Sequence, residues 1–186
     1  MWVRCFVAID PPPGAVADLD DFLEARRDVV GPRWSDPALW HLTLAFLPSV
    51  PDPVVDELVD RVGDAVSGRE PVRLALAGGG CFPDVTRARV LWAGVLGGES
   101  LAPLARSVRA AASVVGAAPE GGPFRPHLTL ARFGQPVEGT RWVRVLDGYT
   151  GPEWAADEVV LVESHLPRDR GHRPRHEVLA RFAVGG

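Results

Sequence analysis

Two stretches of the chain carry the same five residues, and those residue types suit acid–base chemistry. His-Leu-Thr-Leu-Ala begins at His41 and again at His127. With five His and five Thr in 186 residues, chance predicts only about 0.13 His-x-Thr triplets, so the repetition is not coincidental. Imidazole gains and loses a proton near neutral pH, and a threonine hydroxyl both donates and accepts hydrogen bonds. The two stretches therefore predict one site built from both.

The sequence also predicts which side chains of each stretch face that site. Successive side chains of a β-strand point to opposite faces. His41, Thr43 and Ala45 are expected on one face, and Leu42, Leu44 and Phe46 on the other, core-packed face. If a pseudo-twofold axis relates the copies, two imidazoles and two hydroxyls meet around one point. Such a group suits a phosphodiester, with an attacking oxygen on one side, a leaving oxygen on the other and non-bridging oxygens between.

The rest of the chain alternates strand and helix patterns that could position this site. Strand patterns occur at 2–10, 41–47, 71–82, 88–95, 124–133, 157–166 and 175–184. Helix patterns occur at 12–30, 51–67, 100–116 and 140–149. A helix and a Pro-containing loop precede each copy of the motif, as in a duplicated unit. We therefore expect an α+β fold, a single domain over 1–186.

The expected domain has two pseudo-symmetric lobes with the active-site cleft between them. Each lobe is expected to be a small antiparallel sheet with helices on its outer face, carrying one motif, at 41–44 or 127–130. The lobes are expected to meet loosely around 68–70. The last two strands are free to return to the first lobe.

Composition excludes several kinds of chemistry. The net charge of −4 argues against coating long nucleic acid, although one phosphate could still be held in a local pocket. All twenty basic residues are Arg. Without Lys the chain cannot form a Schiff base, carry a nucleotidyl group on Lys or use a phosphate-loop Lys. Any side-chain cation that meets a phosphate here, apart from a protonated His, is a guanidinium, whose planar fork suits that contact.

No cofactor is expected from the motif. A metal site needs three or more protein ligands, and Thr is a poor one. No Ser or Cys repeats with the motif as a nucleophile would. Cys5 and Cys81 have no metal-type spacing, and Cys5, which lies in an apolar run, is interpreted as a buried thiol. The chain shows neither a signal-peptide pattern nor a membrane-spanning apolar stretch. We expect a cytoplasmic monomer.

The paired H-x-T-x motifs and their flanks resemble the 2H phosphoesterase superfamily, in its branch of RNA 2′,3′-cyclic phosphodiesterases, also called 2′-5′ RNA ligases. The resemblance covers nearly the whole chain and rests on RCFVAIDPP, HLTLAFLPSVPD, GGGCFPD, RVLWAGV, PFRPHLTLARF, DEVVLVESHL and HEVLARF. It implies that the substrate is RNA or a nucleotide with a 2′,3′-cyclic phosphate end, that the product carries a 2′-phosphate, and that no metal takes part.

The resemblance also implies residue roles. His41 matches the proton donor to the leaving 3′-oxygen, and His127 matches the proton acceptor that activates water. Thr43 and Thr129 match the residues that bind the phosphate oxygens. The symmetry of the sequence does not by itself distinguish the acid from the base.

Two arginines flank the second motif and are candidates for substrate binding. The family's HLTLAR pattern favours Arg132 as a phosphate-side residue, although strand alternation places it on the leucine face unless the strand bulges or ends there. Alternation places Arg125 on the His127 face unless Pro126 disturbs it. A solvated Arg at the strand end is the alternative for each.

Several aromatic and imidazole side chains have weaker claims. Trp34, Trp40 and Phe46 are candidates for base stacking, with Phe46 better explained as core because it shares the leucine face. A further group consists of the three remaining histidines, which we interpret as surface or core-edge residues: His165, His172 and His176. The resembling branch often has an aromatic residue at position 176.

Alternative functions remain open at this point. The fold could bind phosphorylated RNA ends without turnover, although Arg would serve that purpose better than a half-neutral His. The same histidines could join RNA ends by the reverse reaction. The substrate could also be another of the superfamily's, such as a cyclic phosphate on an ADP-ribose derivative or a 2′-5′ oligonucleotide.

The Arg-rich loop 167–174 also has two interpretations. It contains Arg168, Arg170 and Arg173, and Arg175 follows it. The loop is either a solvated hairpin tip or a basic flap over the mouth of the cleft that contacts upstream phosphates.

Overall fold

The described part of the chain, residues 1–166 and 174–185 of a computed structural model, contains four α-helices, nine strands and four short 3₁₀ helices. The helices are α1 Pro13–Glu24, α2 Val55–Val66, α3 Ala102–Val114 and α4 Thr140–Asp147. The strands are β1 Trp2–Ile9, β2 Pro32–Trp34, β3 Leu42–Pro51, β4 Val72–Phe82, β5 Ala88–Leu96, β6 Leu128–Val137, β7 Thr150–Ala156, β8 Glu158–His165 and β9 Arg175–Ala183. The α+β class is confirmed, and each expected element is present with shifted ends.

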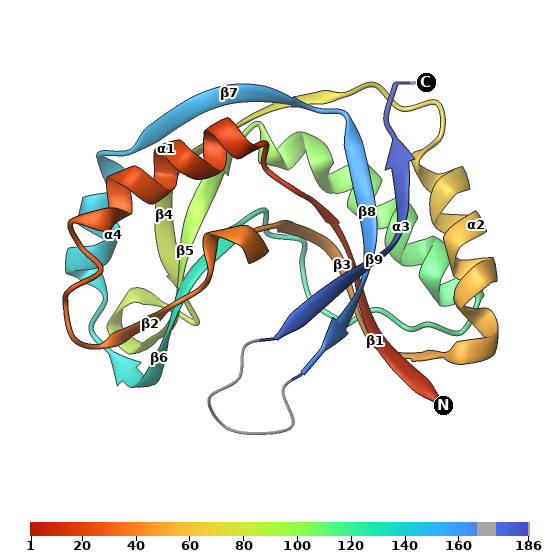
Figure 1. Ribbon diagram of the computed structural model, residues 1–186, viewed down its shortest axis with the longest axis horizontal. Coiled ribbons are helices and arrows are strands. Elements are labelled where there is room, and N and C mark those ends of the chain that lie inside the picture. The colour runs from red at the N-terminus through yellow and green to blue at the C-terminus, as the bar shows by residue number, and fades with distance from the viewer. Residues whose placement is uncertain (167–173, 186) are drawn as a thin grey trace.

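The strands form one curled antiparallel sheet with the two motif strands, β6 and β3, side by side at its middle (Figure 1). The order is β7-β4-β5-β6 followed by β3-β1-β8-β9, with β2 added on β6. The two sets meet where Leu42 of β3 faces Leu128 of β6, the register pair recorded between these strands. These leucines hold the same place in the two motifs, so the pseudo-twofold relation runs through their pair. The last strands do return to the first lobe, because β8 pairs with β1.

The two lobes exchange helices. Helix α1 leaves β1 in the first lobe but packs on β7 and β4 of the second, while α3 crosses back to pack on α2 and β3 (Figure 1). The lobes are therefore not contiguous stretches divided near residues 68–70. Each motif strand instead lies in a lobe that is covered partly by a helix from the other half of the chain.

Helix α1 is shorter than the pattern over 12–30 predicts. Ala15, Leu19 and Leu23 are buried at a spacing of four, which is one face of a helix. Beyond Glu24 the apolar residues Val29 and Val30 are exposed, so the pattern there does not reflect burial. The chain then forms β2, which the sequence does not predict because three residues that include a Pro resemble a loop.

Strand β7 is also absent from the sequence prediction. It contains Gly151 and Pro152, which interrupt a strand pattern. The sheet tolerates the Pro because β7 lies at the edge, where only β4 needs its backbone hydrogen bonds.

A β-bulge occurs at the same position in both motif strands. On β3, the partners of Val7 and Ala8 are Ala45 and Thr43, so Leu44 is an extra residue. On β6, the partners of Leu91 and Trp92 are Ala131 and Thr129, so Leu130 is the extra residue. A bulge of one residue reverses which face the following side chains reach.

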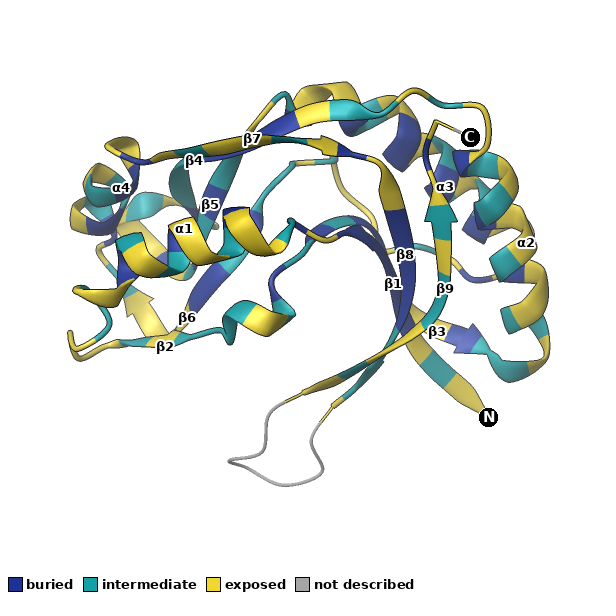
Figure 2. Ribbon diagram, turned by 45° about the horizontal axis from the view of Figure 1, so that its top comes forward, coloured by how far each residue is buried: buried dark blue, intermediate teal, exposed yellow. Residues whose placement is uncertain are grey.

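The bulge corrects the expected faces in both copies. Ala45 and Leu47 join Leu42 and Leu44 in the main core, while Phe46 lies on the other face of the sheet. That second face carries a small apolar cluster on the side away from the helices, and Figure 2 shows its buried middle strands, β1 and β8. The cluster consists of Phe6, Ala8, Val160 and Val162, with Phe46 packed against it.

Candidate functional site

Both motif histidines are held by the backbone in the same way. The Nδ1 atom of His41 lies 2.8 Å from the carbonyl oxygen of Leu39, and that of His127 lies 2.7 Å from the carbonyl oxygen of Arg125. A carbonyl can only accept, so Nδ1 carries the hydrogen in each ring. The Nε2 atoms are then the nitrogens left to exchange protons with a substrate.

The strand crossing brings the four expected residues together. Leu42 and Leu128 are antiparallel partners, so the residues flanking them are cross-paired: Thr43 comes opposite His127, and Thr129 opposite His41. Directly opposite Cα atoms in such pairs are about 4.5–5.5 Å apart. The proximity also appears in the electrostatics, because the charge of His127 lowers the pKa of His41. The register thus places the backbone of each motif histidine opposite the threonine of the other motif.

His41 lies in a ring-lined, nearly buried position. Its imidazole stacks on Phe6, with ring centroids 4.4 Å apart and planes 17° from parallel. The ring of His176 packs edge-on against both, 5.6 Å from His41 and 4.9 Å from Phe6. Burial lowers the pKa of His41 to about 4; the Leu39 carbonyl raises it in part, and His176 and His127 lower it further. In the free protein His41 is therefore neutral at pH 7.

His127 has rings of a different kind around it. Phe82 contacts it edge-on at 4.8 Å between centroids, and Trp92 lies at 6.2 Å. Burial lowers the pKa of His127, the Arg125 carbonyl raises it, and the Arg132 guanidinium lowers it. The two halves of the site are therefore alike in backbone and different in chemistry, since the third imidazole is on the His41 side and the guanidinium on the His127 side.

The threonines are free to bind a ligand. Thr43 and Thr129 are half-buried, and within the described ranges neither hydroxyl has a hydrogen bond to the protein. A hydroxyl in that position can donate to an anionic oxygen.

The bulge decides the placement of Arg132. Leu128 and Leu130 are buried, Ala131 is buried with them, and Arg132 is exposed on the side of Thr129. Its influence on the pKa of His127 places its charge near that ring. Arg125 precedes β6, so strand alternation does not apply to its exposed side chain, and its carbonyl is the group that holds His127.

The three base-stacking candidates lie elsewhere than expected. Trp40 is buried in the main core and Trp34 packs edge-on against Trp142, 5.5 Å between centroids. These two predictions are wrong, because both indoles fill the space between sheet and helices. The prediction that Phe46 shares the leucine face is wrong for the opposite reason, since the bulge turns this ring to the face of the sheet that carries Phe6.

Sequence reasoning missed the place of His176 in the site. Its register partner on β8 is Ser164, and it reaches the same face as Phe6. The signal that could have found it is the pairing of the β8–β9 hairpin with β1, which cannot be deduced from β9 alone. His165 fits the surface interpretation, because it lies between Glu163 and Glu177 at 3.4 Å from each. His172 and the loop arginines Arg168, Arg170 and Arg173 lie outside the described residues.

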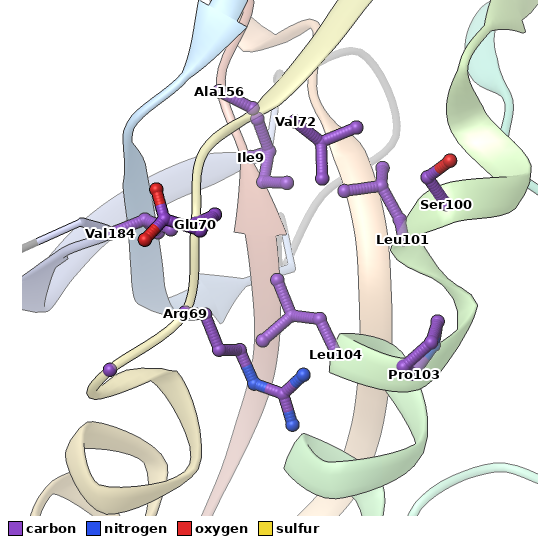
Figure 3. A pocket seen from close by; sticks show the side chains of 11 residues that line it. Ile9, Arg69, Glu70, Val72, Ser100, Leu101, Pro103, Leu104, Ala156 and Val184 are labelled. Atoms are coloured by element: carbon purple, nitrogen blue, oxygen red, sulfur yellow. The ribbon is translucent and has the colours of Figure 1, made fainter.

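Other features of the described chain do not suggest a second site. No group of three His, Cys, Asp or Glu among residues 1–166 and 174–185 could hold a metal ion. A pocket of about 350 Å³ is lined by residues that include Arg69, Leu101 and Leu104 (Figure 3), and no residue of either motif lines it. Its Arg69 is engaged with the Ala65 carbonyl and the Ser107 hydroxyl, so this guanidinium has a packing role. None of the helices described in the structure is long and apolar enough to cross a membrane.

Comparison with known proteins gives a consistent result. Residues 11–168 match the family described as the 2'-5' RNA ligase superfamily. An RNA 2',3'-cyclic phosphodiesterase of Aquifex aeolicus is 31% identical over 159 residues, which cover 83% of this chain and 82% of that protein. One of Geobacillus stearothermophilus is 30% identical over 82% of this chain, and the match spans about half of that relative, 48%.

Two solved structures share the fold. The structure of TT0787 of Thermus thermophilus superposes with a TM-score of 0.81 at 28% identity, covering 98% of each chain. E. coli LigT complexed with 3'-AMP superposes with a TM-score of 0.80 at 25% identity, covering 100% of each chain.

Proposed function

The chain belongs to the 2'-5' RNA ligase superfamily, and we propose that it is an RNA 2′,3′-cyclic phosphodiesterase that converts cyclic phosphate ends of RNA or nucleotides to 2′-phosphates. The observation that carries the proposal is the pair of backbone-anchored imidazoles at the strand crossing, where the register puts each motif histidine opposite the threonine of the other motif. The relatives named RNA 2',3'-cyclic phosphodiesterase support the reaction, and the LigT complex with 3'-AMP supports a nucleotide as ligand.

The proposed reaction is a single displacement at phosphorus. Nε2 of His127 takes a proton from water as the water oxygen forms its bond to phosphorus. The bond from phosphorus to the 3′-oxygen breaks, and Nε2 of His41 gives its proton to that oxygen. The phosphate stays on the 2′-oxygen. One imidazole has gained a proton and the other has lost one, so exchange with solvent restores both.

The threonines and Arg132 stabilise the charge that builds up during the displacement. Thr43 and Thr129 donate to the two non-bridging oxygens from opposite strands, where they are fixed before the reaction begins. Arg132 lies near His127 and adds positive charge on the side of the attacking water. These groups need no metal ion, so the proposed mechanism is metal-independent.

For His41 to act as the acid, its imidazole must become protonated when the substrate binds. With a pKa of about 4, His41 is neutral in the free protein at neutral pH. A bound phosphodiester anion favours the charged imidazole and raises this pKa. The assignment of His41 as acid and His127 as base follows the resemblance, while the free-state pKa of His41 alone would suit a base. The substrate's charge is thus part of the proposed mechanism.

Product analysis tests the proposal. The protein is incubated with nucleoside 2′,3′-cyclic phosphates, an RNA oligomer with a cyclic phosphate end, linear 2′-5′ and 3′-5′ diesters, and an ADP-ribose cyclic phosphate. Mass spectrometry and chromatography then distinguish 2′- from 3′-phosphate products. We expect 2′-phosphates from the cyclic nucleotide substrates. Tight binding without turnover would contradict the enzyme proposal in favour of a binding module.

The same assay addresses ligation. The reverse reaction would join a 5′-hydroxyl to the cyclic phosphate through the same two imidazoles, and the absence of Lys leaves no Lys-adenylate route. Adding a 5′-hydroxyl oligomer in excess would reveal any joined product beside the hydrolysed one.

A further inference from the structure

An arginine outside the motifs lies on the face of the first-lobe sheet that carries Phe6 and His41. The Arg4 guanidinium stacks over the Phe46 ring, with Cζ 4.4 Å from the ring centroid. Phe46 packs on the cluster that contains Phe6, and Phe6 stacks on His41. A continuous run of side chains thus leads from the catalytic imidazole to an exposed cation.

The pseudo-symmetry gives this cation a counterpart in the second lobe. Phe46 faces Phe6 across β3 and β1, and Arg132 faces Val90 across β6 and β5. Both residues stand at the same place after the bulge, so Phe46 is the first-lobe equivalent of Arg132. The second lobe therefore has a guanidinium at that position, and the first lobe has a ring with a guanidinium stacked on it.

The charge of Arg4 is not used by the rest of the described structure. Within residues 1–166 and 174–185 no carboxylate lies within ion-pair distance of its guanidinium, unlike Arg73, which pairs with Glu153, and Arg181, which pairs with Glu158. The ring holds the guanidinium by a cation–π contact, and the Arg4 side chain is exposed, so a ligand in solution can reach it. An anion is the ligand that guanidinium N–H donors bind best.

The position of Phe46 indicates which phosphate would be bound. Because Leu44 is the extra residue of the bulge, Phe46 is two ladder positions beyond Thr43 along β3, or roughly 7 Å at the rise of a β-strand. The cyclic phosphate is placed between the motifs, so Arg4 stands beyond it on the His41 side. In the proposed mechanism His41 protonates the ribose 3′-oxygen, so the ribose and the chain attached to it lie on that side.

Resting on the proposed function, we infer that Arg4, held on Phe46, binds the backbone phosphate of an RNA strand upstream of the nucleotide that carries the cyclic phosphate. The subsite would make the protein prefer RNA ends to mononucleotides, and the flat guanidinium adds a surface on which an upstream base can stack.

The test compares substrates of two lengths. KM is measured for a nucleoside 2′,3′-cyclic phosphate and for a five-nucleotide RNA ending in a cyclic phosphate, with wild type and Arg4→Gln. We expect the ratio of the RNA KM to the mononucleotide KM to be about 5-fold higher in Arg4→Gln than in wild type at low salt. That factor is the upper range for an exposed charge contact. In Arg4→Gln the slope of log KM for the RNA against log salt concentration should be about 0.7 smaller than in wild type, the value for one phosphate contact on a single strand.

A matched control separates this contact from a general loss of positive charge. Arg141 is likewise exposed and stacked on a ring, Trp142 on α4, at 4.9 Å, but α4 packs on β4 in the other lobe. Arg141→Gln should leave the KM ratio and the salt slope as in wild type. The inference would be overturned if the KM ratio shifted equally in both variants or stayed unchanged in Arg4→Gln. It would also be overturned if Arg4→Gln raised KM equally for both substrates.

A binding measurement keeps the inference separate from the proposed reaction. Fluorescence anisotropy of a labelled five-nucleotide RNA with a 2′-phosphate end reports affinity without turnover. If wild type hydrolyses no cyclic phosphate, the proposed function fails, and a weaker Kd in Arg4→Gln than in Arg141→Gln would still support the subsite. Equal Kd values in these variants would refute it whether or not turnover occurs.

Discussion

The rings of His41 and His176 contact each other edge-on, 5.6 Å apart between centroids and 71° between planes. His176 comes from β9, the last strand, and His41 from the start of β3, so the contact joins distant parts of the sequence. On the first-lobe side of the site an imidazole thus packs against the motif histidine. On the second-lobe side Phe82 and Trp92 pack against His127 instead.

We predict that the ring of His176 matters more than its nitrogens. His176→Phe keeps a ring of similar shape against His41 and should retain kcat within about 3-fold. His176→Ala removes an edge-to-face contact worth about 0.5–1.5 kcal/mol and should lower kcat by about 3- to 10-fold. The comparison is steady-state kinetics on one cyclic nucleotide. An equal, large loss in both variants would show that a nitrogen of His176 takes part.

Removal of either motif histidine should abolish most of the activity. His41→Ala and His127→Ala are each expected to lower kcat by at least about 10²-fold, the usual effect of losing a general acid or base. Thr43→Ala and Thr129→Ala should each cost about 1.5–3 kcal/mol, the range for a hydrogen bond to a charged group. Circular dichroism provides the control for folding. Wild-type rates in a folded histidine variant would refute the paired mechanism.

A sulfur substitution distinguishes the acid from the base. In a cyclic substrate with sulfur as the 3′-bridging atom, the leaving group is a thiolate, which needs no proton from an acid. On this substrate His41→Ala should recover most of its lost rate relative to wild type, while His127→Ala should stay slow. Recovery in His127→Ala instead would reverse the assignment.

The pH behaviour of His41 should depend on the ligand. In the free protein its imidazole should titrate with a pKa of about 4, because burial disfavours the charged ring. Adding a nucleoside 2′-monophosphate should raise that pKa, since the phosphate anion favours the charged form. NMR titration of the ring Cε1–H signals measures both, with His41→Ala to assign the signal. A free-state midpoint near that of an ordinary exposed histidine, about 6.5, or no response to the ligand, would contradict the structure-based expectation.

Chelation should not affect the reaction. The proposed mechanism uses two imidazoles, two hydroxyls and a guanidinium, and the described residues include no cluster suited to a metal ion. Hydrolysis is expected to persist at the same rate in excess EDTA. Loss of activity with EDTA that a divalent ion restores would show that a metal takes part.

Features of this protein that repeat or recur locally can be predicted from its sequence. The doubled His-Leu-Thr-Leu-Ala stretch identifies four residues that the structure brings together at Leu42 and Leu128. Apolar periodicity predicts the order of the long helices and strands, because burial of one face leaves its period in the chain. Short or interrupted strands such as β2 and β7 leave no such period, and the sequence does not predict them.

The side chains that surround those four residues depend on contacts between distant parts of the chain. The bulges at Leu44 and Leu130 shift one residue out of register, which reverses the faces of Phe46 and Arg132 without any mark in the apolar pattern. The exchange of α1 and α3 between lobes and the arrival of His176 beside His41 depend on pairing between distant strands. Such contacts are set by the packing of the whole sheet, so local sequence patterns cannot supply them.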